Sequence, residues 1–272
     1  MTRTTPLVRQ RVRDVARAEL IRLTSTYRPY GFAIAAVAVA AVMSTVAVLL
    51  AAAVTALGAD YQMEGESLVR GASSAGLPTV ALICGVIAMD ISLSDRACGA
   101  DNLTALNVPK RRRTFFARLL VVGGFSIAVG VVALSVGAIF VAGIASTTGE
   151  ERALSSVGLD LSRVIGSIGA CLLVVCIAHG LAHVLPGVML PYAVFFVVMS
   201  VLPVLARALR GHEGFGVADL VLTLTPSEHI GTLTAGGVLG VVAVAVPCAW
   251  AAACLVAGVL RADPPATRGV AT

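Results

Sequence analysis

Two histidines are spaced so that both could bind one metal ion. His179 and His183 form an H-x-x-x-H pair, which places both imidazoles on one face of a helix. A zinc site needs three or four ligands, and this pair lacks the intervening glutamate of metalloprotease helices. Neutral imidazoles at a helix end also bond to water or backbone. Two interpretations therefore stand: half a metal site, or polar packing groups.

The other candidate chemical groups do not combine into a hydrolase. The serines of segment 71–76 have no paired histidine, and neither do the adjacent Glu150 and Glu151. The single lysine, Lys110, follows a proline and precedes an arginine, so the chain has no G-x-x-x-x-G-K-[ST] loop for nucleotide phosphates. The sequence predicts no catalytic residues, no metal site and no cofactor in this chain.

The composition predicts a membrane protein. Hydrophobic residues make up 58% of the chain and charged residues 13%, whereas ordinary soluble domains carry about a quarter charged residues. A helix needs about 20 apolar residues to cross a bilayer. Six runs qualify, at roughly 31–57, 77–93, 118–145, 164–184, 188–206 and 238–260. We expect an all-α polytopic membrane protein with one transmembrane domain over 1–272, comprising an arm (1–30), a six-span bundle (31–260) and a tail (261–272).

The basic residues sort to one side of these spans. The arm holds seven, the 94–117 loop five and the tail two, and with Arg118 this makes fifteen of the twenty lysines and arginines. The positive-inside rule therefore places both termini in the cytoplasm. Because this sorting explains the net charge of +5, we infer no nucleic-acid partner from it.

The arm has the pattern of a helix at a membrane surface. In segment 7–26 the apolar side carries Val8, Val12, Val15, Ala16, Leu20 and Leu23, and the rest carries Arg11, Arg13, Arg17 and Arg22. Such a helix lies in the inner-leaflet interface with its arginines among anionic lipid headgroups, and Pro29 ends it. A solvated arm with incidental amphipathicity is the alternative.

Two further segments leave alternatives open. Asp90 lies near the inner end of the second span, and an aspartate is too short to reach far toward water. It either pairs with an arginine of the arm or loop, or faces water just past a span that ends early. Segment 207–237 either forms two short helices that dip back into the outer leaflet or is a plain outer loop.

The connector between the second and third spans carries the most specific pattern, DRACGADNLTALNVPKRRRTFFAR over 95–118. After Gly99, Leu103 and Leu106 stand at helical spacing, and Pro109 ends that run. We expect a two-turn helix with a small apolar face. The basic cluster that follows includes Arg112 and Arg113, which we place at the membrane surface.

With the arm and the six spans, this connector resembles that of a type-2 ATP-binding-cassette (ABC) exporter permease. The family's short connector helix has an acidic residue, a glycine, leucines, a proline and arginines, and the matching residues here are Asp95, Gly99, Leu103, Leu106, Pro109, Arg112 or Arg113, and Arg118. Asp95 stands where glutamate is usual, and Ala100 where a small hydroxyl residue often follows the glycine.

The resemblance implies a cytoplasmic coupling helix seated in a groove of a separate ABC ATPase subunit, which would bind ATP and Mg. The arm would be the connecting helix against membrane lipids. A second permease chain, identical or related, would complete the pathway in a bacterial inner membrane. The cargo would be lipophilic or amphipathic: a drug, an antibiotic peptide or a lipid. The rival class is a membrane protein that needs no ATPase, either a secondary transporter or a membrane-embedded enzyme, and a scaffold subunit is a third possibility.

Overall fold

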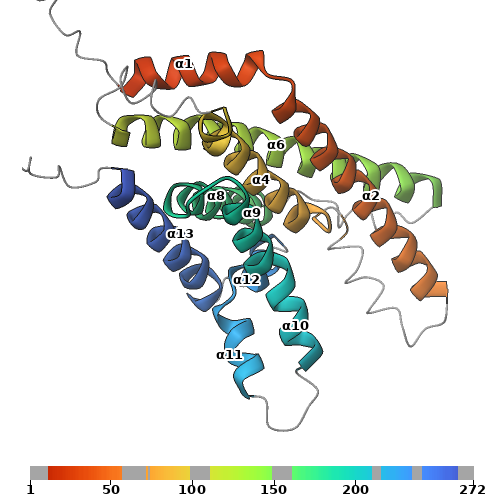
Figure 1. Ribbon diagram of the computed structural model, residues 1–272. Coiled ribbons are helices and arrows are strands. Elements are labelled where there is room, and N and C mark those ends of the chain that lie inside the picture. The colour runs from red at the N-terminus through yellow and green to blue at the C-terminus, as the bar shows by residue number, and fades with distance from the viewer. Residues whose placement is uncertain are drawn as a thin grey trace, which may run out of the picture.

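The computed structural model describes residues 12–56, 72, 74–98, 111–148, 161–209, 216–234 and 241–262. Within these residues the regular elements are all helices (Figure 1). In chain order they are α1 (Val12–Ser25), α2 (Arg28–Ala56), α4 (Leu77–Ala97), α6 (Arg111–Thr148), α8 (Leu161–Val184), α9 (Met189–Phe196), the π-helix η2 (Val197–Val201), α10 (Leu202–Leu209), α11 (Gly216–Leu224), α12 (Pro226–Thr234) and α13 (Val241–Ala262).

Six spans in the described residues are long and apolar enough to cross a membrane. They are α2, α4, α6, α8, the continuous α9–η2–α10 unit and α13. The all-α, multi-pass membrane architecture predicted from the sequence is therefore confirmed. The helix of the third span, α6, begins at Arg111, before the predicted span. The arginines that precede the apolar run are good helix formers, so they form the first turn of the same helix.

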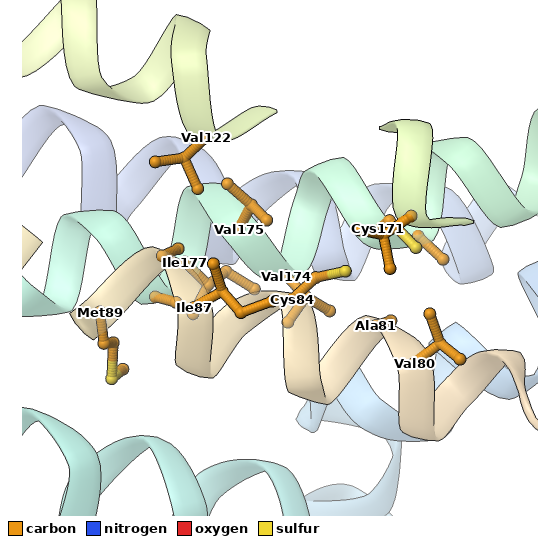
Figure 2. Packing of buried hydrophobic residues seen from close by; sticks show 14 of the residues in the cluster. Val80, Ala81, Cys84, Ile87, Met89, Val122, Cys171, Val174, Val175 and Ile177 are labelled. Atoms are coloured by element: carbon orange, nitrogen blue, oxygen red, sulfur yellow. The ribbon is translucent and has the colours of Figure 1, made fainter. Parts of the chain in front are cut away.

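The core of the bundle lies where α8 packs against α4, α6 and α13. Figure 2 shows Cys84 and Ile87 of α4 beside Val174 and Ile177 of α8. Such small and branched side chains let helices approach closely in lipid, where packing contacts rather than water exclusion hold helices together. At the α8–α13 crossing, a Cβ on Gly180 would lie 2.5 Å from the Cys254 carbonyl, so only glycine fits there.

The fifth span is not a regular α-helix. Its α9 and α10 segments are joined by the π-helix η2, which ends two residues before Pro203. Proline has no N–H for the helix ladder and its ring crowds the preceding turn, and a wider π-turn relieves that crowding. The tight connector before this span turns at Gly187, whose φ of +72° suits a residue without a Cβ.

Segment 207–237 contains two short helices, α11 and α12, so the plain-loop alternative is wrong. α12 packs against α8 and α13 and buries Ile230 and Leu233. The backbone oxygen of Leu233 approaches α8 so closely that a Cβ on Gly166 would lie 2.1 Å from it. The indole N–H of Trp250 on α13 donates to the Leu224 carbonyl at 2.9 Å. α12 therefore covers the end of the bundle at which α8 begins, while α11 packs beside α10.

Candidate functional site at the connector end

The candidate site is the end of the bundle where α4 ends and α6 begins, which we call the connector end. Of the predicted coupling residues, Asp95 lies in the last turn of α4, while Gly99, Leu103, Leu106 and Pro109 lie outside the described residues. Of the predicted surface arginines, Arg13 and Arg17 are exposed on α1, Arg112 and Arg113 begin α6, and Arg11 lies outside the described residues. The structure thus describes the two helix ends that flank the predicted coupling helix.

Helix α1 is docked on this end and lies beside the first turns of α6 (Figure 1). The Arg118 guanidinium of α6 donates to the Glu19 carboxylate of α1 at 2.9 Å, and their side chains are only 6% and 10% exposed. Val15 and Leu23, one turn to either side of Glu19, are buried with it. The helix predicted for the arm is present, and one face of it contacts the bundle.

The apolar side of α1 is therefore divided between two surroundings. Val15 and Leu23 pack inward, while Val12 and Leu20 stay exposed beside the exposed Arg13. An exposed stripe of apolar and basic residues is the pattern of a helix that contacts lipid headgroups and the upper acyl chains. Lipid contact thus remains an expectation for this outer stripe alone.

Arg22 has protein partners that the sequence did not predict. We assigned it to the lipid headgroups with the other arm arginines, but it donates to the Ile91 carbonyl of α4 at 3.0 Å and to the Ser94 hydroxyl. It also lies 3.6 Å from Glu19, one turn away on α1. Arg22 therefore ties α1 to the last turns of α4.

Arg96 ties the end of α4 to the end of α8. Its Nη1 donates to the Ala182 carbonyl at 2.7 Å and to the Leu185 carbonyl at 3.0 Å. The last carbonyls of a helix have no partner within it and carry partial negative charge, which a guanidinium satisfies. In the sequence we counted Arg96 only among the basic residues of the loop. The available signal was its position just past the end of the predicted second span.

The two histidines bond within the protein. His179 is fully buried, with Nδ1 2.7 Å from the Ser92 hydroxyl of α4 and Nε2 3.1 Å from the Phe115 carbonyl of α6. His183 Nδ1 lies 2.9 Å from the His179 carbonyl, and the Phe115 ring contacts both imidazoles. In the described residues no third potential ligand joins the pair. The contacts fit the interpretation as polar packing groups.

Asp90 is half-buried on α4, inside the span. Among the described residues it forms no ion pair, although Tyr192 of α9 lies near both Asp90 and the Arg28 guanidinium. The predicted pairing with an arginine of the arm or loop is thus not found in the described part of the chain. Arg11 and the 99–110 segment fall outside it.

These contacts brace both ends of the connector. The end of α4 is bonded to α1 through Arg22 and to α8 through Arg96, and the start of α6 is bonded to α1 through Glu19 and to α8 through His179. Each of these contacts joins one end of α4 or α6 to a different helix of the bundle. A scan of protein-family models and a search of curated proteins find no match to this chain.

Proposed function

We propose that this chain is the membrane-spanning permease subunit of an ATP-driven exporter of the type-2 ABC class. Its connector would seat in a groove of a cytoplasmic ABC ATPase subunit that binds ATP and Mg, and a second permease chain, identical or related, would complete the pathway. The connector end would face the cytoplasm of a bacterial cell, because the excess of basic residues lies there.

The bracing of the connector end is the observation that carries this proposal. A loop that only reverses the chain direction needs no polar contacts between its flanking helix ends and other helices. Here four polar contacts fix the flanking helix ends to two further helices, α1 and α8. A partner that pushes on the connector would therefore move α1, α4, α6 and α8 together. This property is what ATP-driven coupling requires of a permease.

The cargo we propose is lipophilic or amphipathic, such as a drug, an antibiotic peptide or a lipid. The six spans contain few charged side chains, so they offer little to stabilise a small ion along its way.

A secondary transporter is the second candidate, and Asp90 favours it. A half-buried acid inside a span that has no ion-pair partner among the described residues is the type of group that carries protons or binds cations in such transporters. This alternative requires no nucleotide-binding partner, so one purification separates the two candidates.

The decisive experiment is mild purification of the tagged protein from its native host, with mass spectrometry of the chains that accompany it. The proposal expects a nucleotide-binding chain and, by native mass spectrometry, two permeases with two ATPases. A permease monomer without an ATPase, under conditions that preserve other such complexes, would contradict it.

A substitution then locates the docking element. Leu106→Arg should leave the protein inserted and expressed but remove the ATPase from the complex, because a charge cannot enter an apolar groove. Leu106→Met is the matched control and should retain the ATPase. Arg112→Ala, beyond Pro109, should mainly weaken headgroup contact or topology. Retention of the ATPase by the Leu106→Arg protein would show that the connector is not the docking element.

A further inference from the structure

The His179 side chain hydrogen-bonds to both helices that flank the connector. It lies on α8, and its two ring nitrogens bond to Ser92 of α4 and to the Phe115 carbonyl of α6, across 87 and 64 positions of sequence. Ser92 lies five residues before the end of α4, and Phe115 four residues after the start of α6. The imidazole therefore stands between the two helix ends from which the connector departs.

The partners determine where the proton of this imidazole lies. A carbonyl only accepts hydrogen bonds, so Nε2 must carry a proton to bond to the Phe115 oxygen. A doubly protonated ring would be a fully buried cation, and no carboxylate of the described residues bonds to it. The ring is therefore neutral, and its unprotonated Nδ1 accepts from the Ser92 hydroxyl, whose single proton is shared with the Ala88 carbonyl of the same helix at 2.6 Å. Nε2 is then the donor to α6, and Nδ1 is the acceptor from α4.

The surroundings leave the ring little freedom to move. The Phe115 ring lies 4.5 Å from the His179 ring and 4.8 Å from that of His183, measured between centroids. A Cβ on Gly258 of α13 would meet the same Phe115 ring at 3.0 Å, so this ring is confined from the other side as well. A displacement of either α4 or α6 would therefore stretch a bond to α8 rather than turn the imidazole.

We infer that His179 is a positioning residue that joins both ends of the connector to α8, so that the two ends move together with that helix. For the ATP-driven movement this inference rests on the proposed function, while the joining of the helix ends does not. A serine or glutamine side chain at this place could hydrogen-bond to one of the two flanking helices. A neutral imidazole has a donor and an acceptor on opposite sides of a rigid ring, which suits two helices at once.

The test separates the two bonds by the length of the replacing amide. A glutamine amide reaches about as far as Nε2, so His179→Gln retains the bond to Phe115 and loses the one to Ser92. An asparagine amide reaches about as far as Nδ1, so His179→Asn does the reverse. His179→Ala loses both. Ser92→Ala, which also loses the hydroxyl's bond to the Ala88 carbonyl, should affect the same connector end as His179→Gln.

Amide hydrogen exchange of the purified chain in lipid nanodiscs is the first measurement. His179→Gln and Ser92→Ala should raise exchange at 92–98 roughly threefold to tenfold and leave exchange at 111–118 unchanged. His179→Asn should raise exchange at 111–118 and leave 92–98 unchanged. His179→Ala should raise exchange in both segments. Exchange in α12 is the reference and should not change. A uniform rise that includes α12, or no rise at either end in any variant, would overturn the inference.

The second measurement uses the complex with its ATPase, trapped with ATP, Mg and vanadate. In the wild type, trapping should alter exchange at both connector ends and in the last two turns of α8. Because Arg96 also bonds to the end of α8, His179→Ala is made in an Arg96→Met background. The change should still reach α8 in Arg96→Met alone and should no longer reach it in the double variant. If α8 still responds in that variant, His179 does not transmit the movement. If no ATPase accompanies the wild type, the proposed function fails, while the exchange pattern of the isolated chain still tests whether His179 joins the helix ends.

Discussion

The Arg118 guanidinium and the Glu19 carboxylate form a buried ion pair across 99 positions of sequence, at 2.9 Å. It joins the helix of the predicted arm to the first turns of the third span. Because both side chains are almost fully removed from solvent, either charge would be strongly unfavourable without the other. The arm is thus an integral part of the bundle at the connector end.

Removing this carboxylate should destabilise the protein. Glu19→Gln removes the carboxylate charge that faces the buried Arg118 guanidinium and should lower the free energy of unfolding by about 3 kcal/mol. Reversible unfolding in mixed micelles of mild detergent and dodecyl sulfate measures it. Arg17→Gln, an exposed arginine on the same helix, is the control and should change stability by less than about 0.5 kcal/mol.

A double-mutant cycle isolates the pair itself. Glu19→Gln combined with Arg118→Gln should cost less than the sum of the two single changes, because each single change already removes the same Glu19–Arg118 ion pair. Additive single effects would mean that the two side chains do not depend on each other.

Arg96 should contribute through its two carbonyl bonds. Arg96→Met retains much of the aliphatic stem but removes the bonds to Ala182 and Leu185, and should cost roughly 1.5–3 kcal/mol of unfolding free energy. Arg96→Lys keeps the charge without the planar fork and should cost less. Equal unfolding free energies of the wild type and the Arg96→Met protein would show that Arg96 does not stabilise the connector end.

Two glycines of α8 offer a matched test of its packing against α13. Gly180→Ala places a methyl group 2.5 Å from the backbone of Cys254 and should destabilise the protein by about 1–3 kcal/mol. At Gly169 nothing lies within 4 Å of the added carbon, so Gly169→Ala should be neutral or stabilising by up to about 1 kcal/mol. The same micelle unfolding assay compares them. Similar losses at both positions would contradict the close crossing at Gly180.

Substitutions of Asp90 test whether its carboxylate has an ion-pair or hydrogen-bond partner outside the described residues. With no ion pair there, Asp90→Asn should leave the unfolding free energy unchanged or raise it slightly, because an amide is easier than a carboxylate to hold within a span. Asp90→Ala should behave alike. A loss above about 1 kcal/mol in the alanine variant that the asparagine variant largely restores would instead reveal a partner in the arm or the connector.

The positions of the spans followed from the sequence alone. A helix in lipid must satisfy its backbone hydrogen bonds within itself and present about 20 apolar residues, and both requirements are local. For the same reason the arm helix and the short helices of 207–237 were each among the alternatives that the sequence offered. The helix of the third span extends back beyond the predicted span, to Arg111, because helix formation does not stop where the apolar run stops.

The partners of the polar side chains were decided by the tertiary structure. Arg22, Arg96 and His179 each bond to groups between 64 and 89 positions away in the chain. No pattern in the sequence indicates these pairings. In sequence they were an arm arginine, a loop arginine and half of a possible metal site. Which carbonyl or hydroxyl each one reaches depends on how the helices rotate and cross, and that follows from close packing at positions such as Gly180.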